Sequence, residues 1–589
     1  MNAVTATSAD DTAVDPITFE VVKNALASAA DEMALIIMRS AYSPVVRDSM
    51  DYSTALCDRH GQVVAQGLTL AVQLGSFPDC MKVLATHHAP TARPGDVFLF
   101  NDPYGSGGQH LPDVYIVKPI FCEGAIEGWA CTMAHHCDVG GITPGSCAMH
   151  ATEIFQEGLC VPVVKLHEAG VPNETLLRIL AKNTRLPVQV LGDIRAQLAA
   201  CGVGERAYLQ LIRKYGIAQL RRYLDALQDQ AERLMRKVIS EIADGRYSFV
   251  DFIDGLGDEP QPLKIAVEIT VNGDEIKVDF TGSSPQVPAA LNCPVPMINS
   301  VTYCAIRCMS NVEIPNCEGY MRPVKIFVPR GTILNPEHPA ACAARGVMGY
   351  RVFDAILGAL AQVVPERVQG AGEGGPTLFA IGGRHEGRPF VLTEVMVGTW
   401  GARSELDGVE GISNPAANLS NNPVELIEAE LPLEVLEYSF VPDSGGPGRQ
   451  RGGLAFAREF RLLADEAVCT LRSDRRTHPP YGVKQGKPGA GSQNVLNPGT
   501  PAERGLPTMP MMAIPLRKGD VLRHVGAGGG GFGPPQLRDP QKVLEDVLDG
   551  KVSVEGARRD YGVVIDQRAS RVDEVATAAA RRALASHVN

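Results

Sequence analysis

The stretch GGQHLPDV, residues 107–114, carries two side chains that can bind a metal ion or move a proton, His110 and Asp113. On a helix, residues three apart share a face, but the paired glycines and Pro112 argue against a helix here. The two side chains are therefore expected in a loop. Their chemistry then depends on whether a third side chain reaches them.

Two apolar runs follow this stretch, residues 113–121 and 129–136, separated by the turn-like segment CEGAIEG. An antiparallel hairpin centred near residue 125 would pair positions whose numbers sum to about 250, so that Val114 faces His136. The start of the first strand and the end of the second strand then lie at the same end of the hairpin. A slip of one or two residues preserves this shared end.

The hairpin is expected to bring His135 or His136 beside His110 and Asp113, with Asp138 close by. Two imidazoles and a carboxylate form a common ligand set for a divalent metal with open coordination positions. The alternative is a hydrogen-bonded cluster of loop residues that binds nothing. The glycines on both sides fit a site where the backbone approaches a ligand closely.

Several segments must position these residues. Residues 16–46 are expected to form a helix that begins after Asp15 and ends before Pro44, and 51–58 and 97–102 are expected to form strands. Helical spacing dominates residues 174–244, closing on Gly245, and strands return at 246–335.

These segments predict an α+β, multidomain chain rich in antiparallel strands, with a helical segment near 174–244 and a helical C-terminal tail. We divide it into an N-terminal α+β region with the metal-binding residues, a helical segment, a β-rich domain, a Gly/Pro-rich β domain and a helical tail: 1–173, 174–245, 246–345, 346–535 and 536–589.

Composition narrows the possible partners. The 589 residues carry a net charge of −12 and contain no strongly basic stretch, which argues against nucleic acid. No run approaches the roughly 18 apolar residues of a membrane helix, and the first residues do not read as a signal peptide. We therefore expect a cytoplasmic protein, away from membranes. The 14 cysteines include no CxxC pair and are expected to be buried thiols.

Two short motifs suggest other functions. DSGGPG at 443–448, with AHHC at 134–137, is like the nucleophile and histidine loops of trypsin-like proteases, but the two stretches are too distant and Pro442 departs from that pattern. GAGGGGFG at 526–533 contains GxGxxG, but prolines rather than a helix follow it. GxxxxGK[ST] is absent, so the sequence has no phosphate loop of its own, and the absence of GxSxG argues against an α/β-hydrolase.

Nine blocks in the same order make the chain resemble the hydantoinase B/oxoprolinase family nearly from end to end. The blocks are DPITFEVVKNALASAADEM, MDYSTALCD, NDPYGSGGQHLPDV, AHHCDVGGITPGS, VDFTGSSPQV, GTWGARSELDG, NNPVELIEAELPL, DSGGPGRQRGG and GGGGFGPPQLRDPQKVLEDVLDGKVS.

The resemblance implies a B-type subunit of an ATP-dependent cyclic-amide hydrolase acting on a hydantoin, a lactam or oxoproline. An A-type partner subunit would bind ATP with Mg²⁺ and phosphorylate the carbonyl oxygen. A water on a divalent metal in the B-type subunit would then attack the carbonyl. Such a division of labour implies a hetero-oligomer.

The resemblance also implies the metal ligands Asp51, His110, Asp113 and His135, with His136 as the alternative to His135. Asp138, like His136, is expected just outside the ligand set, where it would orient a histidine. Two imidazoles and two carboxylates suit zinc, manganese or iron. Glu153 lies within reach by sequence but has no assigned role.

Two other functions stay open. The first is a subunit of an ATP-dependent ketone carboxylase of the acetone or acetophenone type, which the same resemblance includes. The second is a non-catalytic scaffold for the A-type subunit, although a scaffold has no need of four ligands in register.

Overall fold

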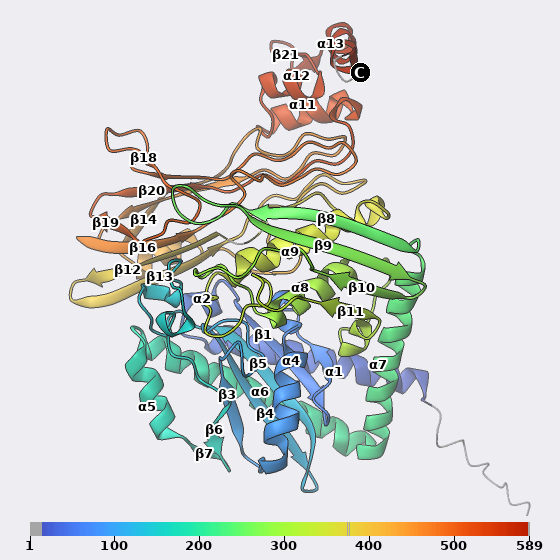
Figure 1. Ribbon diagram of the computed structural model, residues 1–589, viewed down its shortest axis with the longest axis vertical. Coiled ribbons are helices and arrows are strands. Elements are labelled where there is room, and N and C mark those ends of the chain that lie inside the picture. Colours follow the sequence, from blue (N-terminus) through green and yellow to red (C-terminus); the bar gives the residue numbers. More distant parts are fainter. Residues whose placement is uncertain (1–13, 374, 376, 587–589) are drawn as a thin grey trace, which may run out of the picture.

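The computed structural model describes residues 14–586 apart from 374 and 376, with the side chains of 584–586 left aside. The N-terminal part is a seven-stranded sheet with the strand order β2-β1-β5-β4-β3-β6-β7 (Figure 1). Its strands are β1 (Tyr52–Asp58), β2 (Val63–Gln66), β3 (Val97–Phe100), β4 (Asp113–Cys122), β5 (Ala125–His135), β6 (Val164–Glu168) and β7 (Val171–Pro172).

The first helix, α1 (Pro16–Ser40), begins as its sequence predicts, but it ends earlier. The Asp15 side chain accepts a hydrogen bond of 2.8 Å from the Thr18 amide, and Pro16 takes the first helical position. A separate short helix, α2, follows at Pro44 rather than one continuous run. The short helices of this part are α2 (Pro44–Arg47), α3 (Ala71–Leu74) and α4 (Phe77–Val83).

The expected hairpin is confirmed, with a register two positions from the expected one. Asp113 pairs with His135 and Val114 with Ala134. The loop is only the two residues Glu123 and Gly124, whose φ values of 51° and 82° are the left-handed pair typical of a tight hairpin turn. A bulge beyond Ile120 shifts the pairing further. The shared strand end survives, as expected.

The helical segment consists of α5 (Glu174–Asn183), α6 (Pro187–Tyr215) and α7 (Ile217–Ser240). Gly216, with φ of 80°, separates α6 from α7 and donates its amide to the Ile212 carbonyl at 2.7 Å. The last helix ends at Ser240, so the expected closure on Gly245 is wrong. Gly245 instead begins strand β8, where period-2 alternation replaces helical spacing.

Residues 245–360 form a four-stranded sheet with two helices packed beside it. The sheet order is β11-β10-β9-β8, and α9 contacts both β8 and β9. The expected boundary at residue 345 falls on the first residue of α9, a helix whose 16 residues are all buried. The elements are β8 (Gly245–Ile253), β9 (Leu263–Asn272), β10 (Glu275–Asp279), β11 (Val324–Phe327), α8 (Val295–Cys308) and α9 (Arg345–Leu360).

The Gly/Pro-rich region contains two further sheets, ordered β13-β12-β16-β19 and β14-β15-β20-β17-β18. Helix α10 (Val424–Glu430) precedes β14. The strands are β12 (Thr377–His385), β13 (Arg388–Met396), β14 (Leu433–Phe440), β15 (Phe456–Leu462), β16 (Glu466–Arg472), β17 (Gln493–Leu496), β18 (Arg504–Gly505), β19 (Ile514–Arg517) and β20 (Val521–Val525).

Extended segments beneath the C-terminal helices form what we call the glycine bundle, in which residues 526–533 run among 370–372, 399–402, 444–453 and 481–490 (Figure 1). Successive amides of residues 528–531 donate at 2.9 Å to four carbonyls of different neighbours, those of Ala490, Gly453, Ala371 and Lys487. A Cβ at Gly529 would lie 2.1 Å from the Trp400 carbonyl oxygen. Glycine is required here because backbones touch one another directly.

The C-terminal tail is helical, as expected, and has a small apolar cluster of its own around Val543 and Tyr561. It contains α11 (Pro540–Leu548), α12 (Val554–Tyr561) and α13 (Glu574–Ser586), with a two-stranded ribbon of β21 (Ile565–Asp566) and β22 (Arg571–Val572).

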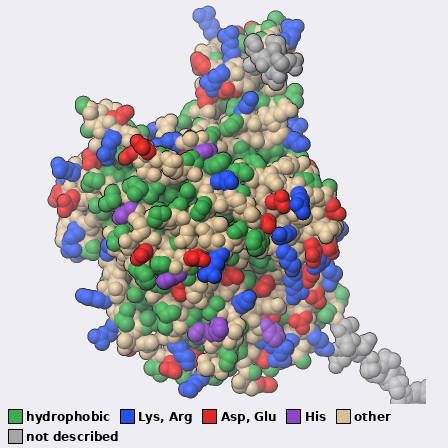
Figure 2. All heavy atoms as spheres, in the orientation of Figure 1, with side chains coloured by type: hydrophobic (Ala, Val, Ile, Leu, Met, Phe, Trp, Pro, Cys, Tyr) green, Lys and Arg blue, Asp and Glu red, His purple; other side chains and the backbone are tan. Residues whose placement is uncertain are grey.

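One large apolar cluster draws residues from the first four expected regions, from Phe19 in α1 to Met509 before β19. The seven-stranded sheet, α6, α7 and α9 therefore share a continuous core. Figure 2 shows acidic and basic side chains interspersed along the edge that carries α7. Within residues 14–586, no helix combines the length and apolar character needed to cross a bilayer.

Candidate metal centre

Strand pairing places the central residues of the site. Asp113 is the first residue of β4 and His135 the last of β5, and the two lie opposite each other in the ladder. His110 stands one turn earlier, with its carbonyl accepting the Asp113 amide at 3.1 Å. One possible ligand atom from each of the three side chains lies within 4.8 Å of the others. The three residues are buried, at 2 %, 0 % and 4 % exposure in chain order.

Three buried polar atoms in this group have no hydrogen-bond partner among the described residues: His110 Nε2, Asp113 Oδ1 and His135 Nδ1. His110 Nε2 lies 3.2 Å from Asp113 Oδ1, but the two are not aligned for a hydrogen bond. Leaving such groups unsatisfied costs about 1–3 kcal/mol each. A shared cation would satisfy all three, so the arrangement fits a divalent metal.

The protonation states also suit metal binding. Burial lowers the pKa of His110, and burial together with His110 lowers that of His135 to about 3. Both imidazoles are therefore neutral, as ligands must be. Burial alone would raise the pKa of Asp113, but the Arg345 guanidinium and His110 hold it well below its usual range. Asp113 is thus a carboxylate at neutral pH.

Asp51 precedes β1 and lines the same small cavity as His110 and His135. Its carbonyl accepts the His135 amide at 2.9 Å, and its carboxylate accepts Gln73 Nε2 at 2.5 Å. It lies outside the group of three that meets within 4.8 Å. Burial, followed by the Asp113 carboxylate, raises the pKa of Asp51 to about 7.

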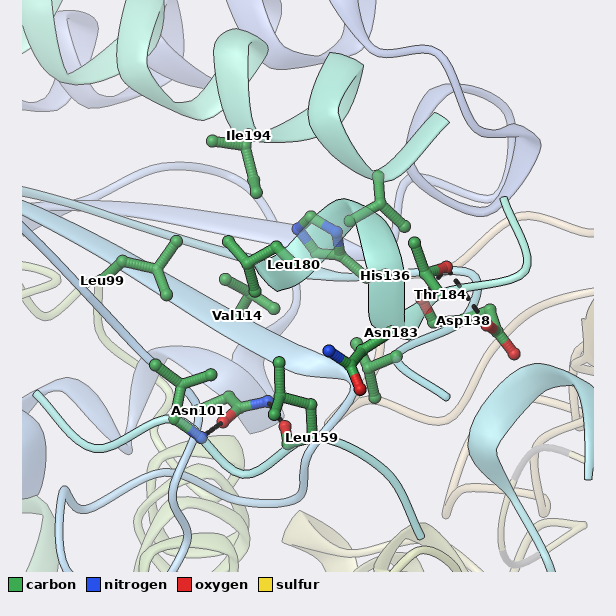
Figure 3. A pocket seen from close by; sticks show the side chains of 13 residues that line it. Leu99, Asn101, Val114, His136, Asp138, Leu159, Leu180, Asn183, Thr184 and Ile194 are labelled. Atoms are coloured by element: carbon green, nitrogen blue, oxygen red, sulfur yellow. Dashed lines mark hydrogen bonds between the residues drawn. The ribbon is translucent and has the colours of Figure 1, made fainter. Parts of the chain in front are cut away.

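His136 points away from this cavity, because neighbours on a strand alternate between faces. Its Nε2 lies 3.1 Å from Gln197 Oε1, and its ring lines a separate cavity together with Asp138 (Figure 3). Leu180 and Asn183 of α5 and Ile194 of α6 close that cavity.

Asp138 differs from its expected role. Its Oδ1 accepts Arg185 Nη1 at 2.8 Å, and its Oδ2 accepts the Arg185 amide at 2.8 Å. The Gly145 amide donates to it as well. These partners occupy both oxygens, so Asp138 anchors the 140–145 loop, and none of its hydrogen bonds within the described chain reaches a histidine. Glu153 caps the single turn Ile154–Gln156 and is exposed.

Sequence reasoning missed the residues that reach the triad and its cavity from distant parts of the chain. Arg345, at the start of α9, forms an ion pair with Asp113. Arg472, at the end of β16, and Tyr350 line the same cavity. They lie more than 200 residues from His110, beyond any local spacing. The visible signal is an arginine in the apolar run ACAARGVMGY, where burial requires a partner.

A buried acid supports the His110 ring indirectly. His110 Nδ1 lies 3.2 Å from the Ala343 carbonyl. Glu157 accepts the amides of Cys342 and Ala343 at 2.8 and 2.7 Å, which fixes that carbonyl in place. Burial raises the pKa of Glu157 to about 8. Fixing the far nitrogen of a ligand histidine is a usual device of metal sites.

The protease-like stretch does not form a nucleophile site in the described structure. The Ser444 hydroxyl donates to the Val441 carbonyl at 2.5 Å, and Asp443 accepts the Ser553 amide at 2.8 Å. Both residues therefore organise turns next to the glycine bundle.

Comparison with known proteins identifies the family of the chain. The family model for hydantoinase B/oxoprolinase matches residues 15–535. A protein of Pseudomonas sp. strain NS671, assigned as the B component of a D-/L-hydantoinase, is 36 % identical over 94 % of this chain and 95 % of its own length.

Two solved structures share the fold. The crystal structure of ATP-dependent caprolactamase from Pseudomonas jessenii matches with a TM-score of 0.90 and 31 % identity, covering 97 % of this chain and 100 % of that one. Nucleotide-free acetone carboxylase also has a TM-score of 0.90, but at 20 % identity over 97 % and 83 % of the two chains it shows the fold alone. The chain belongs to the hydantoinase B/oxoprolinase family.

Proposed function

We propose that this chain is the metal-bearing B-type subunit of an ATP-dependent cyclic-amide hydrolase that opens a hydantoin, lactam or oxoproline-like ring. The observation that carries the proposal is the set of three unpartnered, buried ligand atoms on His110, Asp113 and His135. The relatives at 31–36 % identity, a hydantoinase B component and a caprolactamase, support the substrate class.

In this proposal His110, Asp113 and His135 hold zinc, manganese or iron, and Asp51 is the fourth ligand at the cavity wall. A divalent metal polarises a carbonyl oxygen or lowers the pKa of a water molecule toward neutrality. Arg345 keeps Asp113 ionised, and burial keeps both imidazoles neutral. Glu157, through the Ala343 carbonyl, fixes the orientation of the His110 ring.

The partner is an A-type subunit that binds ATP with Mg²⁺ and activates the amide carbonyl. This chain has no GxxxxGK[ST] phosphate loop of its own, which fits that division of labour. The buried lining of the cavity supports the same view, because a reactive phosphorylated amide has to be kept from bulk water.

A ketone carboxylase subunit is the second candidate, favoured by the likeness of this fold to acetone carboxylase. The hydrolase is preferred because the relatives of higher identity carry hydantoinase and caprolactamase names.

The experiment that tests the proposal begins with elemental analysis of the purified chain beside His110→Ala. His385→Ala, at an exposed position, is the matched control. We expect about one divalent metal per chain in the unsubstituted protein and the control, and none in His110→Ala. Absence of metal from all three, even after addition of Zn²⁺ or Mn²⁺, would remove the ligand assignment.

Reconstitution with the A-type subunit then separates the candidate functions. ATP-dependent opening of caprolactam, hydantoin or 5-oxoproline supports the hydrolase, whereas ATP use only with a ketone and bicarbonate supports the carboxylase. If His110→Ala assembles with the partner and keeps full turnover, the chain is a scaffold.

A further inference from the structure

Arg472 is a buried cation without a counter-ion. It is 5 % exposed, ends strand β16 and lines the cavity of the triad. Its Nη1 donates only to the Ala343 carbonyl, at 3.4 Å, and its Nε has no partner. Within the described part of the chain it takes part in no ion pair. The other deeply buried guanidiniums all face carboxylates: Arg345, Arg351, Arg451, Arg458, Arg475 and Arg538.

The pKa of Arg472 reflects the free-energy cost of burying its charge. Burial lowers the pKa of Arg472, and Arg345 nearby adds to the effect, whereas Cys147, Tyr350 and Asp51 act in the opposite direction without reversing it. For Arg345 burial acts in the same direction, but the Asp113 carboxylate raises its pKa above the usual range. A buried charge is retained only where something compensates it. In this cavity the missing partner is an anion.

A second feature points to the same spot. The 16-residue helix α9 begins at this cavity, and no side chain caps its N-terminus. Arg345 and Val347 donate their amides to Cys342 and Ala344, but the Gly346 amide has no acceptor among the residues described. Helix N-termini carry partial positive charge and exposed amides, which together bind anions.

Gly346 and Arg472 face each other closely. Gly346 lines the cavity, and a Cβ built on it would lie 3.6 Å from Arg472 Nη2. Tyr350 lines the same wall, and burial raises its pKa, so its phenol stays neutral and can donate a hydrogen bond. The cavity is thus lined both by donors with positive charge and by residues of the triad, and Arg472 Nη1 and His110 Nδ1 both lie against the Ala343 carbonyl.

We propose that Arg472 and the first turn of α9 bind an anionic oxygen group of the substrate, a phosphoryl or carboxylate group, in the cavity that the triad also lines. This rests on the proposed function, because it assigns part of the substrate to that same cavity. The cavity of about 30 Å³ has room for roughly two water molecules, so it receives the charged end of a ligand rather than a whole ring.

The test is the binding of inorganic phosphate and of acetate to the purified full-length chain, measured by calorimetric titration with and without metal. Arg472→Gln removes the charge, Arg472→Lys keeps it, and Gly346→Ala narrows the approach. Arg476→Gln is the matched control: Arg476 is only half-buried and bonds the carbonyls of Ser492 and Leu506.

We expect Arg472→Gln to weaken binding by about 10- to 100-fold, the usual loss for hydrogen bonds to a charged group. Arg472→Lys and Gly346→Ala should fall between it and the unsubstituted chain, and Arg476→Gln should match the latter. Tighter phosphate binding identifies a phosphoryl group, and tighter acetate binding a carboxylate.

Equal binding by Arg472→Gln and Arg476→Gln would overturn the proposal, as would the absence of binding by the unsubstituted chain. Metal content measured on the same samples separates this outcome from failure of the proposed function. Arg472-dependent binding in a chain that holds no metal would keep the anion site and remove the metal centre. A chain that holds metal but shows no Arg472-dependent anion binding would keep the metal centre and remove the anion site.

Discussion

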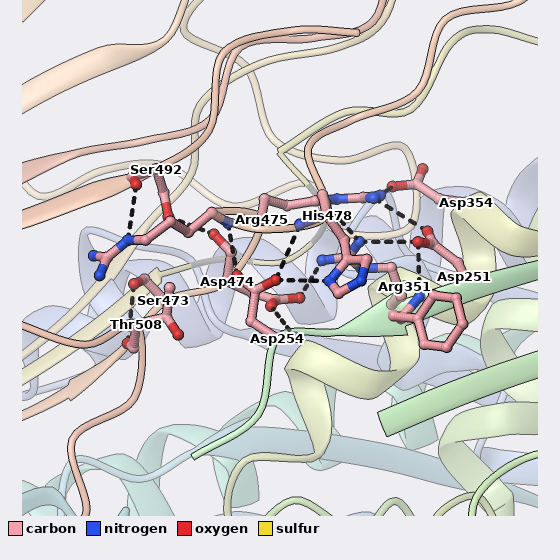
Figure 4. A network of polar contacts seen from close by, with 12 residues as sticks. Asp251, Asp254, Arg351, Asp354, Ser473, Asp474, Arg475, His478, Ser492 and Thr508 are labelled. Carbon is pink, nitrogen blue, oxygen red and sulfur yellow. Dashed lines mark hydrogen bonds and ion pairs between the residues drawn. The ribbon is translucent and has the colours of Figure 1, made fainter. Parts of the chain in front are cut away.

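Helix α9 takes part in two buried charged clusters that differ in how completely their charges are paired. At its start, Arg345 meets Asp113 beside the triad. Farther along, Arg351 and Asp354 join Asp251, Asp474 and Arg475 (Figure 4). Arg475 Nη2 lies 2.5 Å from Asp354 Oδ2, and its Nη1 lies 3.1 Å from Asp251 Oδ2.

This difference in pairing distinguishes a structural cluster from a binding site. In the second cluster, which we call the arginine–aspartate network, each guanidinium meets two carboxylates from other segments. The network therefore joins β8, α9 and the segment after β16 without needing a ligand. In the triad cavity, three ligand atoms have no hydrogen-bond partner and Arg472 forms no ion pair within the described chain. Guanidiniums that are all ion-paired indicate a structural joint, and a buried guanidinium without an ion pair indicates a binding site.

Arg475→Gln is expected to have the largest effect, and it tests whether the arginine–aspartate network is structural. Removing one partner of a buried pair leaves Asp354 and Asp251 short of a cation, which costs about 3–5 kcal/mol. We expect a large fall in the thermal unfolding midpoint with metal content unchanged. Arg461→Gln, which opens a pair whose arginine side chain is 40 % exposed, should change the midpoint little. Equal shifts for the two variants would contradict a structural role for the network.

Asp113→Asn should mainly affect the ligand. Residues just outside a metal's ligand set already change affinity by about 10- to 100-fold, so loss of a carboxylate ligand should exceed about 100-fold. Metal affinity measured by competition with a chelator checks this. Asp102→Asn is the control in the same loop, since Asp102 accepts the Tyr104 amide, contacts Cys160 and does not line the cavity. Unchanged affinity in Asp113→Asn would remove the triad as a metal site.

Substitutions of Glu157 test whether a residue that is not itself a ligand affects metal affinity. Glu157→Ala removes the acceptor for two amides and should weaken metal binding by about 10- to 100-fold. Glu157→Gln keeps an acceptor oxygen, resembles the protonated acid favoured by the raised pKa, and should restore most of the affinity. The exposed Glu153→Ala is the control. Similar losses for Ala and Gln would show that the Glu157 charge, rather than its positioning of Ala343, matters.

The last expected effect depends on pH and concerns Glu373, a buried acid with no cation beside it among the described residues. Burial raises its pKa to about 8, and Thr377 Oγ1 donates to it at 3.2 Å. The unfolded state, with a pKa of 4.5, binds fewer protons than the folded state between pH 4.5 and about 8. The free energy of unfolding therefore falls as pH rises through that window, by up to about 1.4 kcal/mol per pH unit.

Glu373→Gln should lack the contribution of Glu373 to this slope, while other buried acids such as Glu157 keep theirs. Its unfolding midpoint should match that of the unsubstituted chain near pH 4.5 and exceed it increasingly toward pH 8. Glu313→Gln, at an exposed position, should follow the unsubstituted chain at every pH. Parallel curves for all three proteins would mean that Glu373 titrates normally.

These contrasts also explain what the sequence could predict. The meeting of His110, Asp113 and His135 follows from two adjacent strands and a short turn, so local alternation was sufficient, despite a register error from Glu123–Gly124 and the bulge. Asp51 came from family resemblance alone. Arg345 and Arg472 reach the cavity only through the packing of α9 and β16 on the N-terminal sheet, which no local pattern encodes.

The glycine bundle cannot be predicted from the sequence, for a different reason. Sequence patterns report which face of an element is buried, and glycine has no side chain to mark a face. Residues 526–533 therefore show neither period 2 nor period 3.6, although their amides bond to neighbours on several sides.

The bundle also sets an order of assembly. Its central segment, 526–533, bonds to partners as far back as Ala371, so every contact closes a loop of tens to more than a hundred residues. Such pairing is entropically slow, and on a growing chain it has to wait until residue 533 has left the ribosome. The N-terminal sheet, whose hairpin joins neighbours in sequence, can form long before. The triad is thus built early, and the β16 segment that delivers Arg472 is fixed against it late.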